Sequence, residues 1–299
     1  KNQVYKTSDY INEDTQQQNA YNNAIANGEA IISGSQNPTM DKSKIEQAIN
    51  QINTTKNALH GATKLQNDKN AANQTIAQLG SLNDAQKSGE EALVNGSNTR
   101  SDVATQLDKA KALNEAMKKL REKVAEKTTI KQSSDYINDS SQHQNAYNQA
   151  LQDAESIINQ NSNPTLDKSV VEQKLQGLTQ AQNALQGSHL LENAKNNAVT
   201  EINKLTALND AQRQKAIQNV QAQTTIPNVN QQLTTVKELN SAMQALRDAV
   251  GQQNDVHQQS NYFNEDPDKK KAYDDAIKRA EEIIKNSTDP NLNPQDITN

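Results

Sequence analysis

The sequence predicts an all-α fold of tandem three-helix bundles that share long connecting helices and form an elongated rod. Three observations lead to this prediction. Only 32% of the 299 residues are hydrophobic and 3% are aromatic, with no Trp, which suits several thin cores better than one large core. Apolar residues recur at helical spacing. A pattern of 126 residues repeats without insertions, which indicates that the spacing itself matters.

The repeat is visible in short motifs. Ser-Asp-Tyr-Ile-Asn surrounds Tyr10 and Tyr136, and Ser-Asn-Tyr-Phe-Asn surrounds Tyr262, so these tyrosines are each 126 residues apart. Leu-Asn-Asp-Ala-Gln at 82–86 returns unchanged at 208–212. The chain therefore holds two full repeats and the first 47 residues of a third.

The first half of each repeat predicts three helices. A first helix ends near Tyr10-Ile11, and a second begins after Asp14 and runs to about Ser33. A third begins after the N-cap Asp41, where Met40 and Ile45 are placed for a hydrophobic staple. The second helix carries a predicted buried stripe: Tyr21, Ala24, Ile25, Ile31 and Ile32. In the truncated third copy, the equivalent stripe is expected to lack a partner: Tyr273, Ile277, Ile283 and Ile284.

The second half of each repeat predicts another bundle. Asn83 is placed to cap its second helix, with Gln86 completing a capping box, and that helix is expected to stop at Asn95-Gly96 in an αL conformation. One face of the first helix carries Leu65, Ala72, Ile76 and Leu79. The third helix carries Val103, Leu107, Ala110, Leu113, Met117, Leu120 and Val124.

The junctions between bundles lack strong helix breakers. No Pro or turn cluster lies between Leu59 and Leu65, so we expect one helix from about 42 to 79 that changes packing partners midway. Gly61 lies near that change in the first copy, and Gly187 lies at the same place in the second. The stretch from 103 to 136 has only Thr128-Thr129 as a weak point. Helices shared in this way would prevent adjacent bundles from swinging freely.

No group of residues predicts a catalytic, cofactor-binding or metal site, and no cofactor is expected. None of the four histidines is matched by a His in another copy, which favours surface positions for His60, His143, His189 and His257. First-turn helix acids are the expectation for Asp84 and Asp210. Core packing is favoured over a ligand platform for Tyr10, Tyr21, Tyr136, Tyr147 and Tyr273. Solvated faces are expected for Glu90-Glu91 and Lys118-Lys119.

Composition excludes further classes of function. The net charge is −5 with mixed signs along the chain, so there is no basic face for nucleic acid. No apolar run is long enough to span a membrane. No signal peptide, lipidation site or sorting motif is visible, so an exported protein would contain this chain as an internal segment. The absence of Cys excludes disulfides and thiol chemistry.

The two halves of the repeat resemble known modules. Tyr-Ile-Asn, Ala-Tyr, an Ile-Ile pair and Asn-Pro-Thr, followed by an Ile/Leu-rich helix, resemble a FIVAR module. Leu-Asn-Asp-Ala-Gln followed by Leu-Asn-x-Ala-Met-x-x-Leu-Arg resembles a GA module. Their alternation is similar to the family of giant staphylococcal extracellular-matrix-binding proteins. On this basis we assign FIVAR-like bundles to 1–62 and 127–188, GA-like bundles to 63–126 and 189–252, and a partial FIVAR-like bundle to 253–299.

The resemblance implies a non-catalytic repeat segment of a giant adhesin at the bacterial cell surface, attached to the cell wall through regions outside this chain. Two kinds of function stay open. The chain could be a rigid stalk within a matrix-binding or cell-wall-associated protein. It could also be a multivalent binding module, with fibronectin or another matrix protein as the first candidate partner and serum albumin, through the GA-like bundles, as the second. An enzyme has no supporting residues, and a spectrin-like rod would need core Trp.

Overall fold

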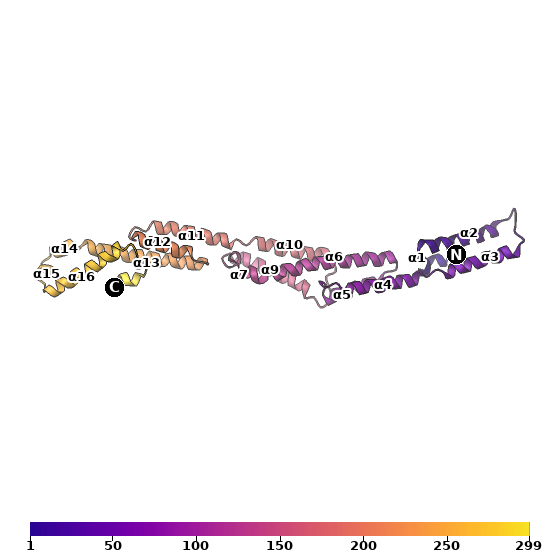
Figure 1. Ribbon diagram of the computed structural model, residues 1–299, viewed down its shortest axis with the longest axis horizontal. Coiled ribbons are helices and arrows are strands. Elements are labelled where there is room, and N and C mark those ends of the chain that lie inside the picture. Colours follow the sequence, from indigo (N-terminus) through magenta and orange to yellow (C-terminus); the bar gives the residue numbers. More distant parts are fainter. Residues whose placement is uncertain (299) are drawn as a thin grey trace. The chain divides into compact units, whose positions relative to one another are not determined.

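A computed structural model describes residues 1–298, and the regular structure in this range is helical, which confirms the all-α prediction (Figure 1). The chain divides into two compact units, 1–126 with 148–180, and 127–147 with the residues from 181 onward. Each unit is described by itself.

The first unit begins with a short 3-10 helix, Val4–Lys6, and contains two groups of helices. Helix α2 packs along α3, α1 packs against the start of α4, and α4, α5 and α6 pack against one another. Residues 148–158 of α9 and 168–180 of α10 complete the unit. The bounds are α1 (Ser8–Ile11), α2 (Thr15–Ser33), α3 (Lys42–Asn57), α4 (Gly61–Ala77), α5 (Asp84–Gly96), α6 (Arg100–Ala125), α9 (Ser141–Ile158) and α10 (Lys168–Asn183).

The second unit repeats the part of this arrangement that α1, α4, α5 and α6 form in the first. Helices α11, α12 and α13 pack against one another, α8 packs against α11, and α13 also packs against α16 and α17. The bounds are α7 (Lys127–Gln132), α8 (Ser134–Ile137), α11 (Gly187–Asn203), α12 (Asp210–Gln221), α13 (Ile226–Gly251), α14 (Gln253–His257), α15 (Ser260–Phe263), α16 (Pro267–Lys285) and α17 (Pro294–Thr298).

The cores are thin and follow the predicted apolar stripes. In the first unit, Ile76, Val94 and Val103 form a buried cluster with Ala72 and Ala110. The corresponding cluster of the second unit also includes the truncated third copy, because Ile297 is buried in it and Ile283 and Ile284 pack against it. The expectation that this stripe lacks a partner was therefore wrong, since α13 supplies one.

The predicted helix starts are confirmed. Asp41 precedes α3 and its carboxylate accepts a hydrogen bond from the backbone N–H of Ser43 at 3.0 Å. Asn83 and Gln86 form the capping box of α5, and Asn209 and Gln212 form that of α12. These side chains satisfy N–H groups that have no partner inside their helix.

The single helix expected from 42 to 79 was wrong, because α3 ends at Asn57 and α4 begins at Gly61. The cause is a tertiary contact. The chain at the end of α1 lies directly on Gly61, where an added Cβ would stand 2.6 Å from the carbonyl carbon of Asn12. The second copy breaks in the same place, between Asn183 and Gly187.

Other local expectations also need correction. The stretch from 103 to 136 is interrupted at Glu126, where α6 ends, and again at Ser133, the N-cap of α8, whereas the expected weak point Thr128-Thr129 lies within α7. The staple between Met40 and Ile45 does not form, because Met40 is exposed. Ile32 is exposed as well. Helix α5 ends without an αL residue: Gly96 is its last residue, and no glycine in residues 1–298 has a positive φ.

Candidate functional site: the joints between modules

Two recurring joints connect the modules. The corner joint is formed by residues 9–13 of α1 and its end with residues 59–62 and 98–100, and it recurs at 135–139, 185–188 and 224–226. The tip joint is formed by residues 83–90 with residues 157–166, and it recurs at 209–216 with 283–292. Each joint lies within one unit.

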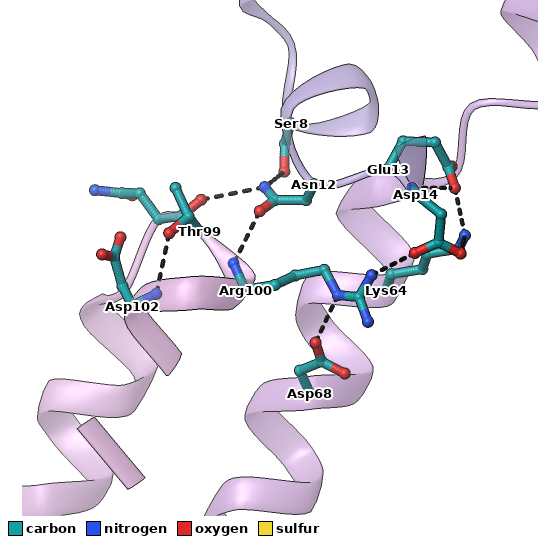
Figure 2. Close-up of polar contacts among 10 residues, drawn as sticks. Ser8, Asn12, Glu13, Asp14, Lys64, Asp68, Thr99, Arg100 and Asp102 are labelled. Carbon is teal, nitrogen blue, oxygen red and sulfur yellow. Dashed lines mark hydrogen bonds and ion pairs between the residues drawn. The ribbon is translucent and has the colours of Figure 1, made fainter. Parts of the chain in front are cut away.

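One asparagine amide holds the centre of the corner joint (Figure 2). The buried Asn12 donates from Nδ2 to the Asn98 carbonyl at 3.1 Å, and its Oδ1 accepts from the backbone N–H of Arg100 at 3.0 Å. Asn138 makes the same pair of bonds to Thr224 and Ile226, at 3.0 and 2.9 Å. Arg100 and Ile226 are the first residues of α6 and α13, so the amide satisfies an N–H that the helix itself leaves free.

Acidic side chains of α1 and of the residues just after it cap the start of α4, and those of α8 and the residues just after it cap the start of α11. The carboxylate of Glu13 accepts from the backbone N–H of His60, and Asp9 accepts from that of Ala62 at 3.2 Å. In the second copy, Asp139 accepts from Gln186 and Asp135 from Ser188. Neither His60 nor Gln186 caps its helix with its own side chain, so these acids take the place of a local cap. Their negative charge also interacts favourably with the positive end of the helix dipole.

The same contacts lower the pKa of two of these acids, Glu13 and Asp139. Burial raises the pKa of Glu13, but the hydrogen bonds from Lys64 and from the backbone of His60 together outweigh it, so the pKa lies below its usual value. Burial likewise raises the pKa of Asp139, and the N–H groups of Gln186 and Ser140 together with His143 bring it below its usual value. A carboxylate accepts from N–H groups best when it is charged.

Ion pairs surround the first corner joint but are not part of the shared design. Arg100 contacts Asp14 at 2.7 Å and Asp68 at 2.6 Å, and Lys64 contacts Glu13 and Asp14 (Figure 2). In the second copy, the positions of Lys64, Asp68 and Arg100 hold Leu190, Ala194 and Ile226. Since Arg100 is more than a third exposed, its ion pairs contribute little to stability. The asparagine, the glycine and the capping acids are therefore what the two joints have in common.

In the tip joint, the side-chain oxygens of Asn83 and Gln86 form the capping box, and their NH2 groups donate to the next module. Asn83 Oδ1 accepts from the Gln86 N–H, while Asn83 Nδ2 donates to the carbonyls of Ile157 and Ile158 at 3.1 and 3.3 Å. Gln86 is buried and donates from Nε2 to the Thr165 carbonyl at 2.9 Å. The second copy has the same bonds, from Asn209 to Ile283 and Ile284 and from Gln212 to Asn291.

The sequence predicted the capping box but not the bonds to the next module. A signal was present, because Ser or Asp at the N-cap and Glu at the third position cap equally well without an NH2 group. Amides at both positions in both copies leave two NH2 groups per copy, and these groups need acceptors elsewhere.

Glu90 is a buried carboxyl at the first tip joint. It is 1% exposed and accepts a hydrogen bond from Gln106, so the prediction of a solvated Glu90 was wrong. Burial raises its pKa, the Gln106 bond lowers it, and the net pKa lies above its usual value. Leu166, Asp167 and Lys168 line the same pocket. The second tip joint has Ala216 at this position, so the carboxyl is not required for the joint to form.

The remaining candidate residues have structural contacts. Tyr21 and Tyr147 are buried, which confirms core packing for these two. His143 and His257 each contact a carboxylate, Asp139 at 3.0 Å and Asp274 at 2.9 Å. Throughout residues 1–298, no three His, Asp or Glu side chains are grouped so that they could hold a metal ion. Of the helices described, none has the length and hydropathy needed to cross a bilayer.

Comparison with known proteins identifies the modules. The FIVAR domain model matches residues 1–60, 116–186 and 242–299, which is more than half of the chain. The chain belongs to the FIVAR domain family. The GA module model matches residues 62–116 and 188–242, between the FIVAR domains. The FIVAR matches that begin at 116 and 242 start inside α6 and α13, so these long helices are shared by neighbouring modules.

This FIVAR and GA array is similar to staphylococcal proteins. The chain is 37% identical over 295 residues to the extracellular matrix-binding protein ebh of Staphylococcus aureus strain MRSA252, covering 99% of this chain and 3% of that protein. The match to EbhA of strain Mu3 is also 37% identical over 295 residues and covers 4% of it. A crystal structure of EbhA residues 756–1003 from Staphylococcus aureus superposes with a TM-score of 0.72 at 29% identity, covering 79% of this chain and 94% of that one. The chain thus spans a small fraction of its curated relatives.

Proposed function

We propose that this FIVAR and GA array is a non-catalytic stalk segment of a cell-surface adhesin, with modules bounded at 62, 126, 188 and 252. One observation carries the proposal: the corner and tip joints recur with the same bonds although the residues around them differ. A buried amide that leaves its partners exposes N–H and carbonyl groups that then lack hydrogen bonds unless water replaces them. Joints of this kind resist bending, and their repetition gives a fixed spacing of modules.

Small-angle X-ray scattering of the whole chain tests the stalk. With a rise of 1.5 Å per helical residue, a rod of two repeats and a partial third would span roughly 120–140 Å. A maximum dimension in that range, with a scattering profile typical of a stiff particle, supports the proposal. A compact particle or the profile of freely hinged beads contradicts it.

Binding to a matrix protein is the second candidate function. Its support is the name of the relatives, extracellular matrix-binding proteins, together with the repetition of the modules, since repetition lets weak sites act together. Fibronectin is the first partner to test and serum albumin the second. Each is immobilised and titrated with the whole chain. Saturable binding supports this function. If no binding is detected at chain concentrations of about 50 μM, only the spacer role is left for these modules.

A further inference from the structure

The end of α5 carries a dipeptide that can react with itself. The sequence contains Asn-Gly twice, at Asn27-Gly28 in the first FIVAR module and at Asn95-Gly96 in the first GA module. In this dipeptide, the backbone nitrogen of Gly can attack the side-chain amide carbon of Asn, because Gly has no Cβ to hinder the approach. The surrounding structure decides at which of the two places the attack is possible.

Ring closure requires the backbone around the Asn to leave the helical conformation, so the position within the helix matters. Asn27 and Gly28 lie in the interior of α2, and Gly28 is buried. Asn95 and Gly96 are the last two residues of α5, and both are exposed. A Cβ added to Gly96 would meet nothing within 4 Å beyond its own turn. The last turn of a helix frays at little cost in free energy, whereas its interior opens only when most of the helix unfolds, so the structure favours reaction at Asn95.

We propose that Asn95 is a site of spontaneous deamidation, and that its isoaspartate product releases the end of α5 from α4. The Gly96 nitrogen bonds to Cγ of Asn95, and the side-chain amide nitrogen leaves as ammonia with the Gly96 proton, which closes a succinimide ring. Water then adds to one of the two ring carbonyls and opens the ring. Opening at one carbonyl gives aspartate and opening at the other gives isoaspartate, so the only co-reactant is water. The proposal does not depend on a stiff stalk or on matrix binding.

Two hydrogen bonds join Asn95 to α4. Lys69 donates from Nζ to the Asn95 carbonyl at 2.7 Å, and Asn73 donates from Nδ2 to Asn95 Oδ1 at 2.9 Å. Aspartate keeps both acceptors. Isoaspartate routes the main chain through the former side chain, which inserts a methylene group into the backbone and turns the α-carboxyl into a side group. Neither acceptor then keeps its place, and the last turn of α5 no longer holds helical geometry.

The second GA module lacks the reactive pair but keeps one of the two bonds. Gln221 and Ala222 stand at the positions of Asn95 and Gly96. Lys195 donates from Nζ to the Gln221 carbonyl at 2.7 Å, the same bond as in the first module. The longer side chain of Gln would have to close a larger ring, and Ala adds a Cβ at the attacking residue, so this helix end does not react in the same way. The chain therefore contains its own internal control.

Ageing the whole chain in warm, mildly alkaline buffer tests the modification. One sample stays folded and another is unfolded in guanidinium chloride. Both are digested in mildly acidic buffer, which stops the reaction, and the peptides are followed by mass spectrometry. In the folded chain, Asn95 should react within about tenfold of its rate in the unfolded chain, and Asn27 should be slowed by about a hundredfold or more. Gly96→Ala, which introduces the residue of the second module into open space, should suppress the reaction at Asn95 while circular dichroism stays unchanged.

Hydrogen exchange tests the structural consequence. Residues 92–96 of the aged chain that contains isoaspartate should exchange about fivefold faster than in the fresh chain, because the bonds to α4 are lost, while residues 218–222 stay unchanged. Asn95→Asp, which adds the charge without altering the backbone, should exchange like the fresh chain. The proposal is overturned if Asn95 is protected as strongly as Asn27, or if Gly96→Ala fails to slow the reaction. It is also overturned if position 95 yields aspartate but no isoaspartate, or if the isoaspartate chain exchanges like the fresh chain.

Discussion

Asn83 uses one side-chain amide to cap a helix and to hold the neighbouring module. Asn83→Asp separates the two roles, because Asp caps a helix as well as Asn does but has no donor for the carbonyls of Ile157 and Ile158. We expect α5 to keep its protection from hydrogen exchange, while residues 157–171 exchange faster by an amount equivalent to about 1–3 kcal/mol. Asn83→Ala, which removes both roles, should expose α5 as well. If the Asp variant leaves residues 157–171 unchanged, the amide bonds do not hold the joint.

Glu90 is an ionisable residue at the first tip joint, and the second tip joint forms with Ala216 at the same position. Its pKa is raised in the folded state, so it favours folding most below the unfolded pKa and loses that contribution as the pH rises through the folded pKa. Glu90→Gln should therefore stabilise the first unit by on the order of 1 kcal/mol at pH 7, and much less near pH 4. Urea unfolding at the two pH values measures this difference.

Glu91→Gln is the matched control for Glu90, since Glu91 lies beside it and is only half-buried. It should change neither midpoint by a measurable amount, because exposed single charges contribute little. The charged neighbours to consider are Lys109, Asp167 and Lys168, which line the same pocket. An equal effect of Glu90→Gln at both pH values would mean that packing rather than ionisation is responsible.

At the scale of helices, the break between α3 and α4 depends on Gly61. An added Cβ would meet the backbone of residues 9–13 at 2.6 Å, and backbone atoms cannot give way as a flexible side chain can. Gly61→Ala should destabilise the first unit by about 1–3 kcal/mol. Gly177→Ala makes the same chemical change in the interior of α10, where nothing lies within 4 Å, and should stabilise by about 0.5–1 kcal/mol. Opposite signs in thermal unfolding are the expected result.

The first turns of α4 and α11 should open in acid. Glu13 and Asp139 have lowered pKa values, so their contribution is present above the ordinary carboxyl range of about 4 and is lost as the pH falls through the lowered values. Hydrogen exchange at residues 60–64 and 186–190, corrected for the intrinsic pH dependence, should show this loss. Glu13→Gln should remove most of the pH dependence at 60–64 only. A pH dependence that persists there would exclude Glu13 as the group responsible.

Helix starts could be predicted from the sequence, but the ends that depend on distant contacts could not. Asp41, Asn83 and Asn209 act on N–H groups two or three residues away, so local sequence contains the whole interaction. The break at residues 58–60 comes from α1, which is about fifty residues earlier, and no local breaker marks it. Glu90 likewise borders a pocket that is also lined by Leu166 of the next module, a neighbour 76 positions further along the chain.

At the scale of the whole molecule, the period of 126 residues predicted the recurrence of modules, and the structure supplies the bonds that recur. Tyr10, Tyr136 and Tyr262 gave the register, but nothing near them indicates that Asn12 and Asn138 contact residues 86 positions further on. An asparagine after a short helix is ordinary as a turn residue. Only its burial and its two partners distinguish it as part of a joint.

The corner asparagines offer a direct test of whether the joints set the stiffness of the chain. Asn12→Ala with Asn138→Ala removes the side-chain partner of one carbonyl and one helix-start N–H at each corner, and because these groups are only partly buried we expect a cost of about 1 kcal/mol per corner. The helices themselves keep their hydrogen bonds, so circular dichroism should be nearly unchanged while small-angle scattering shows a broader distribution of dimensions. Asn50→Ala with Gln176→Ala, an exposed pair at equivalent positions of α3 and α10, is the matched control and should scatter like the unaltered chain. If both double variants scatter alike, stiffness resides in the shared helices α6 and α13 rather than in the corner joints, because those helices are the other connection between neighbouring modules.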